Sequence, residues 1–102
     1  VAIELENTRK EDFRYQDKIF SGYAKDDKVD VVLYVCTSSS ILEAVNENIN
    51  KFPLYKYDYN TRFLVVEYEK VINTNEFVAM NYTKDKYDDS ISINDKMTIN
   101  VK

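Results

Sequence analysis

The first third of the chain has the apolar and polar pattern of a strand, a helix and a second strand. Residues 1–6 alternate, which predicts a strand with one apolar and one mainly acidic face. The apolar face comprises Val1, Ile3 and Leu5, and the other comprises Ala2, Glu4 and Glu6.

Asn7 and Thr8 then offer a helix N-cap, and a helical repeat continues to Lys25. Its apolar side comprises Phe13, Tyr15, Ile19, Phe20, Tyr23 and Ala24. Residues 29–36 are almost all apolar and rich in β-branched side chains, which predicts a strand covered on both faces.

A second helix is predicted after this strand. Ser40 and Glu43 have the spacing of a capping box, in which each side chain pairs with a free backbone N–H of the other residue. Pro53 ends the helix, because the residue before a proline avoids helical backbone angles. The predicted apolar face comprises Ile41, Leu42, Ala44, Val45, Ile49 and Phe52.

The second half of the chain is predicted to consist mostly of strands. Residues 54–59 place three tyrosines on one face if they are extended, and residues 62–69 form a second candidate for a buried strand. Short strands are predicted at 76–82, 90–93 and 97–101.

The order of these elements predicts an α/β fold, because strands joined by helices are normally parallel neighbours. We expect a three-layer domain with a mixed, mainly parallel central sheet and a β-rich C-terminal end. Residues 1–72 are its core and 73–102 its extension, within a single domain over 1–102. The sequence begins at Val1 directly with a strand-like segment, whereas the termini of domains are usually surface segments. We therefore expect this chain to be a fragment of a longer protein.

Composition narrows the classes of function. Fourteen Lys and Arg against eighteen Asp and Glu give a net charge of −4, so no global positive field attracts nucleic acid or an anionic membrane. No apolar run approaches the roughly 20 residues that cross a bilayer, so no membrane association is predicted. The single cysteine, Cys36, cannot form an internal disulfide, which favours a reducing cytosol or leaves the compartment open; a cytoplasmic location is the prediction. Because the chain has no histidine, Ser-His and Cys-His nucleophiles and zinc sites with a histidine ligand are excluded. Any bound metal ion would be held by oxygen atoms, so the candidates are Mg²⁺, Mn²⁺ and Ca²⁺.

Glu4, Glu6 and Lys10 are the candidate chemical site. Two carboxylates two residues apart on a strand point to the same face and can hold a divalent cation, while a nearby lysine stabilises charge during phosphodiester cleavage. The alternative is a strand with one wet face, on which the two glutamates meet water or pair with Lys10.

Several short elements resemble the restriction-endonuclease-like superfamily called PD-(D/E)XK, over residues 1 to about 50. They are Ile3-Glu4-Leu5-Glu6, Thr8, Lys10, Arg14-Tyr15, Lys18, Tyr23 and the apolar strand Asp30-Val31-Val32-Leu33-Tyr34-Val35. In particular they resemble the nuclease-like domains of plasmid replication-relaxation and mobilisation proteins, which have an acidic strand, a basic and aromatic helix and then an apolar strand.

The resemblance implies catalytic roles for Glu4, Glu6 and Lys10, with Glu4 and Glu6 as ligands of Mg²⁺ or Mn²⁺. Glu4 would be the metal-binding acid, but Glu6 stands where an active nuclease has lysine, and Lys10 would have to replace that lysine. The other essential acid of the family lies on an earlier strand and has no counterpart here. The resemblance therefore implies an incomplete catalyst, or a nuclease-like fold that is kept for binding.

Candidate nucleic-acid contacts are Lys10, Arg14, Lys18 and Lys25, which form a basic ridge on the outer side of the first helix. A solvated helix face is the alternative, and Glu11 and Asp17 dilute the ridge. Tyr55, Tyr57 and Tyr59 either stack on unpaired bases or pack against a neighbouring layer. Cys36 is most simply a small buried hydrophobe.

Two classes of function follow. The first is a nucleic-acid-associated, nuclease-like domain of a plasmid or mobile-element protein that contacts DNA or RNA and is catalytically incomplete as this fragment. It would be a divalent-metal-dependent nuclease only if an upstream acid or another subunit completed the site. The alternative is a small acidic protein-binding module such as an inhibitor, immunity or adaptor protein, for which tyrosines are common contact residues.

Overall fold

A computed structural model describes residues 1–58 and 60–101 as an α/β fold around a mixed sheet. Within these residues the sheet has five strands in chain order, β1-β2-β3-β4-β5. The strands are β1 (Ala2–Glu6), β2 (Val31–Cys36), β3 (Arg62–Glu67), β4 (Glu76–Lys84) and β5 (Ile91–Asn100). The first three are parallel, as their helical connections predict, and β4 and β5 form an antiparallel hairpin. The predicted β-rich C-terminal end is therefore confirmed.

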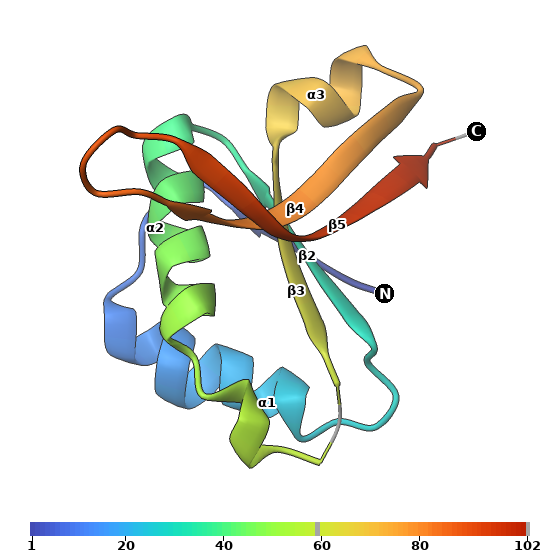
Figure 1. Cartoon of the computed structure of the whole chain (residues 1–102). Helices are drawn as coiled ribbons and strands as arrows, with labels where there is room; N and C mark the ends of the chain where they lie inside the picture. The colour runs from blue at the N-terminus through green and yellow to red at the C-terminus, as the bar shows by residue number, and fades with distance from the viewer. Residues whose placement is uncertain (59, 102) are drawn as a thin grey trace.

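One face of the parallel strands is covered by the two helical connections (Figure 1). They consist of η1 (Arg14–Phe20) continuing into α1 (Ser21–Ala24), and of α2 (Ser39–Lys51) followed by the short turn η2 (Leu54–Lys56). The core on this side is aromatic: the ring of Phe20 lies 5.8 Å from that of Tyr34, 5.5 Å from Phe52 and 5.0 Å from Phe63.

The winding of η1 decides which of its side chains enter this core. Its turns close through i→i+5 hydrogen bonds, so residues five apart lie close to the same face. Tyr15 and Phe20 are accordingly both fully buried, with ring centroids 5.6 Å apart. Phe13, which the regular helical repeat placed on the apolar side, is 51% exposed, so that part of the prediction is wrong.

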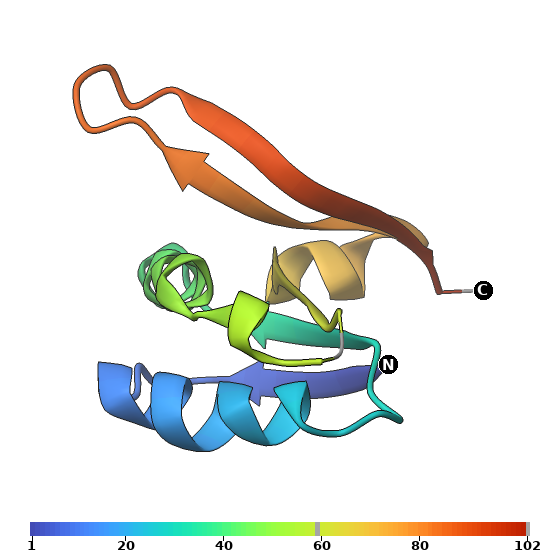
Figure 2. The ribbon, with the colours of Figure 1, turned by 60° about the horizontal axis from the view of Figure 1, so that its bottom comes forward.

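The opposite face of the sheet packs against α3 (Tyr68–Asn73) and the base of the β4–β5 hairpin. α3 contributes Val71 to this second core, and the hairpin contributes Phe77, Ala79, Met97 and Ile99. Within the described part of the chain, the hairpin pairs with β3 at Val65 and Met80 alone, and then extends away from the parallel strands as an arm (Figure 2).

Several predicted boundaries are wrong. The first helix begins at Asp12, not after a cap at Asn7–Thr8. Ser38, and not Ser40 with Glu43, caps α2, because its Oγ accepts a hydrogen bond from the Ile41 N–H at 3.3 Å. The end of α2 is as predicted, since Phe52 before Pro53 is extended.

Other errors concern whole elements. The predicted extended segment 54–59 contains the turn η2, and Tyr59 lies outside the described residues. The predicted strand 62–69 ends at Glu67, and α3, which was not predicted, begins at Tyr68. The two short strands at 90–93 and 97–101 are one strand, β5, which carries a bulge opposite Asn81 and Tyr82.

Candidate functional site

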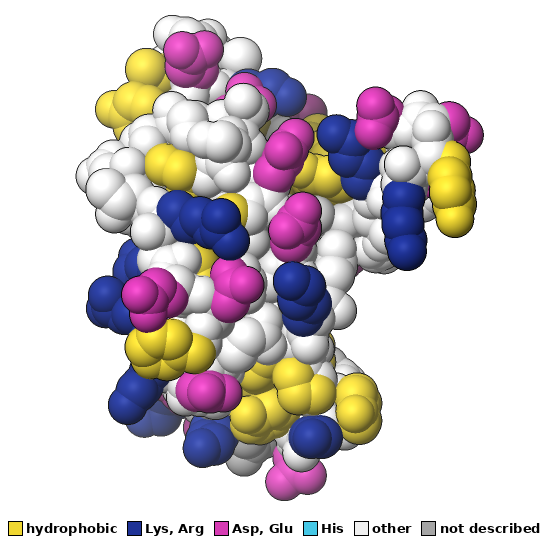
Figure 3. Space-filling view, turned by 90° about the vertical axis from the view of Figure 1, so that its left-hand side faces the viewer, with side chains coloured by type: hydrophobic (Ala, Val, Ile, Leu, Met, Phe, Trp, Pro, Cys, Tyr) yellow, Lys and Arg dark blue, Asp and Glu magenta, His cyan; other side chains and the backbone are white. Residues whose placement is uncertain are grey.

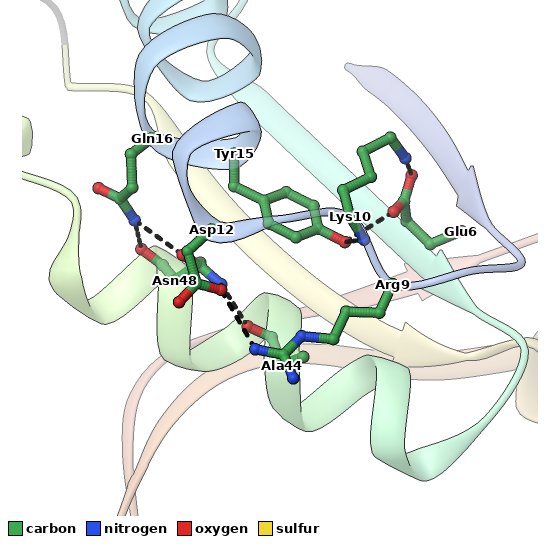
Figure 4. Close-up of polar contacts among 8 residues, drawn as sticks. All are labelled: Glu6, Arg9, Lys10, Asp12, Tyr15, Gln16, Ala44 and Asn48. Atoms are coloured by element: carbon green, nitrogen blue, oxygen red, sulfur yellow. Dashed lines mark hydrogen bonds and ion pairs between the residues drawn. The ribbon is translucent and has the colours of Figure 1, made fainter.

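Glu6 is the centre of a buried polar cluster beneath the first helical segment (Figure 4). Its side chain is 2% exposed. Oε2 accepts a hydrogen bond from the Tyr15 hydroxyl at 2.9 Å, and Oε1 forms an ion pair with Nζ of Lys10. The Tyr15 hydroxyl in turn accepts from the Lys10 backbone N–H at 3.2 Å, so three groups close one ring of interactions. Both carboxylate oxygens of Glu6 are therefore occupied within the chain.

Glu4 is held by a second tyrosine of the same helical segment. Its Oε1 accepts a hydrogen bond from the hydroxyl of Tyr23, which lies in α1. Burial, together with this contact to a carboxylate, raises the pKa of Tyr23 to about 12. Burial and the Glu6 carboxylate likewise raise the pKa of Tyr15 to about 12. The helical repeat puts both tyrosines on the apolar side of the helix and does not predict their polar partners.

Tyr34 lies between these contacts, on β2. It is in register with Glu4 and fully buried, and its hydroxyl has no hydrogen-bond partner among the described residues. Burial, reinforced by the negative charges of Glu4 and Glu6, raises the pKa of the Tyr34 hydroxyl. Two of the three phenols, those of Tyr15 and Tyr23, thus donate to the two carboxylates, and Glu6 is the carboxylate that is removed from solvent.

This arrangement differs from the alternative in which Glu4 and Glu6 lie on a wet face of β1. The predicted acidic face lies under the helix, whereas Val1, Ile3 and Leu5 are 71%, 68% and 53% exposed. β1 is also the edge strand of the sheet, because no strand among the described residues pairs with its outer side. Glu4 and Glu6 do share one face, as predicted, and Lys10 does reach Glu6, as the structural alternative proposed.

A second network, which the sequence analysis missed, joins the start of the helical segment to α2 (Figure 4). The buried amide of Asn48 donates to Asp12 Oδ1 at 3.1 Å and to the Ala44 carbonyl at 3.0 Å. Arg9 also donates to Asp12 Oδ1, at 3.2 Å, and Gln16 donates to the Asn48 carbonyl. The hydrogen bonds from Asn48 and Arg9 lower the pKa of Asp12. These contacts fix the loop that carries Lys10.

The predicted basic ridge is divided by the structure. Arg14, Lys18 and Lys25 are exposed, and none forms an ion pair within the described residues. Lys10 is instead engaged with Glu6, and its side chain is only 25% exposed. On the side of the molecule that carries the hairpin tip, cations and acids are interspersed rather than separated (Figure 3).

Among residues 1–58 and 60–101 no group of three or more Asp, Glu, Cys or His side chains could hold a metal ion. Cys36 is fully buried, and burial followed by the charge of Glu6 raises the pKa of its thiol to about 12, as suits a buried hydrophobe.

The tyrosines after α2 form no common platform among the described residues. Tyr55 is 85% exposed, while Tyr57 stacks on Phe52 with ring centroids 5.3 Å apart. Tyr57 therefore packs against the core, as the structural alternative proposed. The third tyrosine, Tyr59, belongs to the part that the structure does not describe.

Comparisons of the chain with protein-family models, with curated proteins and with solved structures find no match. Among the described residues, no helix is both long enough and apolar enough to cross a lipid bilayer.

Proposed function

We propose that this chain is a nucleic-acid-associated, nuclease-like domain of a plasmid or mobile-element protein, and that it binds DNA or RNA without cleaving it alone. The proposal includes a three-layer fold of the restriction-endonuclease type and a cytoplasmic location. The observation that carries it is a set of three exposed cations on one helical segment, Arg14, Lys18 and Lys25, which form no ion pair with any residue that the structure describes. Such cations are free to neutralise phosphates, which supplies most of the affinity of non-specific nucleic-acid binding.

The contacts of Glu4, Glu6 and Lys10 argue for binding rather than catalysis. A divalent cation needs several free oxygen ligands, but both oxygens of Glu6 are engaged and one oxygen of Glu4 accepts from Tyr23. As arranged, these residues do not fit Mg²⁺ or Mn²⁺, and we derive no cleavage step from them. Cation binding would require Glu6 to release Lys10 and Tyr15.

The test is the salt dependence of nucleic-acid binding. Arg14→Glu with Lys18→Glu removes two candidate phosphate contacts, and Lys70→Glu with Lys86→Glu makes the same change of charge at exposed positions elsewhere. Fluorescence anisotropy with labelled single- and double-stranded DNA and RNA is measured at several salt concentrations. We expect the first variant to lower the slope of log K against log salt by about two, and the control pair to change it less. An equal decrease of this slope in both double variants would contradict the proposed binding surface at Arg14 and Lys18.

A protein-binding module is the second candidate, and the outer face of β1 favours it. An edge strand that exposes three alternating apolar side chains is a template for association with another strand. This function predicts a stable protein partner and no response to salt of the kind described above.

A further inference from the structure

Phe13 is an aromatic side chain that the fold leaves at the surface. It directly precedes η1 and is 51% exposed, whereas Tyr15 and Phe20 of the same segment are fully buried. The i→i+5 winding of η1 is rare in proteins, and such turns are found frequently at functional sites. The winding places two rings in the core and leaves the ring of Phe13 outside it, where a ligand can reach it.

Phe13 lines a shallow surface hollow in which positive and negative charges balance. The hollow has a volume of about 500 Å³, and its other lining residues are Arg9, Lys10, Glu11 and Asp12. Arg9 pairs with Asp12, and Lys10 pairs with the buried carboxylate of β1 (Figure 4). Both cations of the hollow are therefore engaged, while its two carboxylates are exposed. A phosphate would be repelled here, so the hollow suits an uncharged group.

Cations that can contact phosphates lie beside this hollow. Arg14 follows Phe13 in the chain, and Lys18 lies about one turn further along η1. Both side chains are exposed, and neither forms an ion pair with a residue that the structure describes. Asp17, which is also exposed, offsets part of their charge. The electrostatic contribution to binding is thus limited, and a contact that does not depend on charge would add substantially to the affinity.

We propose, as an extension that rests on the proposed function, that this surface prefers single-stranded to double-stranded nucleic acid. An unpaired base stacks on the Phe13 ring, and the adjoining phosphates contact Arg14 and Lys18. A single strand can turn its bases toward the protein, and aromatic rings beside cations are the common platform for them. The carboxylates of Glu11 and Asp12 can accept hydrogen bonds from the amino groups of such a base. A duplex presents its phosphates instead, and the same carboxylates repel them.

The first test compares single-stranded and duplex DNA of one sequence by fluorescence anisotropy. We expect Phe13→Ala to raise the Kd for the single strand about tenfold and to leave the Kd for the duplex unchanged. The slope of log K against log salt should not change, because no cation is removed. Phe13→Tyr keeps an aromatic ring and should bind the single strand as the wild-type chain does. Tyr87→Ala, at a 93% exposed ring in the hairpin tip, should change neither Kd. Circular dichroism checks that each variant keeps the fold.

The second test reports on stacking directly. The chain has no tryptophan, so Phe13→Trp places a single indole in the hollow. A base that stacks on this indole quenches its fluorescence. We expect quenching when a single-stranded oligonucleotide is added and a much smaller change with the duplex. Tyr87→Trp carries its indole at the hairpin tip and should be quenched by neither.

The outcomes separate this proposal from the function on which it rests. An unchanged single-strand Kd in Phe13→Ala, or an equal loss for single strand and duplex, overturns the stacking proposal. If Arg14→Glu with Lys18→Glu still weakens binding in that case, the proposed nucleic-acid function stands without it. A wild-type chain that binds neither form of DNA nor RNA would contradict both.

Discussion

Glu6 is a carboxylate that the fold removes from water, and its environment must compensate for that loss. An ionised carboxylate loses several kcal/mol of solvation when it is buried, and only charged or hydrogen-bonding partners offset this cost. Lys10 supplies the charge and Tyr15 the hydrogen bond. The ring of contacts also ties the loop before the helix to β1, so Glu6 acts as a structural anchor for the N-terminal part of the chain.

Replacing Glu6 tests this account. We expect Glu6→Ala to lower the free energy of unfolding by about 2–4 kcal/mol, because the buried Tyr15 hydroxyl loses its acceptor and a cavity remains. Glu6→Gln keeps an acceptor for Tyr15 and should cost about 1 kcal/mol. Urea unfolding gives both values, and Glu47→Ala, at an exposed position of α2, serves as the control at about 0.5 kcal/mol or less. A loss in Glu6→Ala no larger than in Glu47→Ala would contradict the anchoring role.

At the scale of elements, β4 separates from β3 and needs other hydrogen-bond partners. Among the residues that the structure describes, their register pair is Val65 with Met80, and no strand pairs with the Tyr82 backbone on that side. The buried Asn46 of α2 replaces the missing strand: its Oδ1 accepts from Tyr82 N–H at 3.1 Å and its Nδ2 donates to Tyr82 O at 2.7 Å. Arg62 adds a two-point contact to Asp95 of β5, with both distances 2.9 Å, and this contact lowers the pKa of Asp95.

Removing the Asn46 amide should therefore loosen the hairpin. We expect Asn46→Ala to cost about 2–3 kcal/mol in unfolding free energy, because partners in the backbone of β4 lose their hydrogen bonds. Asn50, which is exposed, also donates to Tyr82 O at 2.7 Å, and Asn50→Ala should cost about 1 kcal/mol or less. Hydrogen exchange at the Tyr82 amide should accelerate in Asn46→Ala and much less in Asn50→Ala. Equal exchange in both variants would show that Asn46 does not replace the strand.

The elements show what local sequence can and cannot predict. The end of α2 followed from Pro53 because a proline acts through its own covalent geometry. The start of α2 did not, because Ser38, Ser39 and Ser40 are chemically equivalent and tertiary packing selects which one is the cap. α3 was missed because Tyr68–Asn73 is short, follows a strand-like run and buries none of its side chains fully, so it has little apolar periodicity to detect.

At the scale of the molecule, the parallel order of β1, β2 and β3 could be predicted because each helical connection is local in sequence. Which face of β1 is buried could not be predicted from the sequence. The alternation of apolar and polar residues defines two faces, but it does not say which of them a helix will cover. Glu4 and Glu6 were thus correctly placed together, while their burial depended on Tyr15 and Tyr23, which the helical repeat marked only as apolar.

The same buried cluster makes the stability of the whole molecule sensitive to alkaline pH. An unfolded chain releases tyrosine protons near pH 10, whereas Tyr15 and Tyr23 in the folded chain have pKa values of about 12. Between these values the folded state binds more protons than the unfolded state, so stability is complete below pH 10 and decreases as the pH rises toward 12.

Tyr15, which is fully buried, should account for about 2 kcal/mol of this decrease. Urea unfolding at pH 8, 10, 11 and 12 should therefore show a shallower decline in Tyr15→Phe than in the wild-type chain. Tyr87→Phe, at a side chain that is 93% exposed, should follow the wild-type curve. If the free energy of unfolding declined equally with pH in Tyr15→Phe and in the wild-type chain, the pKa of Tyr15 would not differ between the folded and unfolded states. That outcome would contradict the effect of burial and of the Glu6 contact on this phenol.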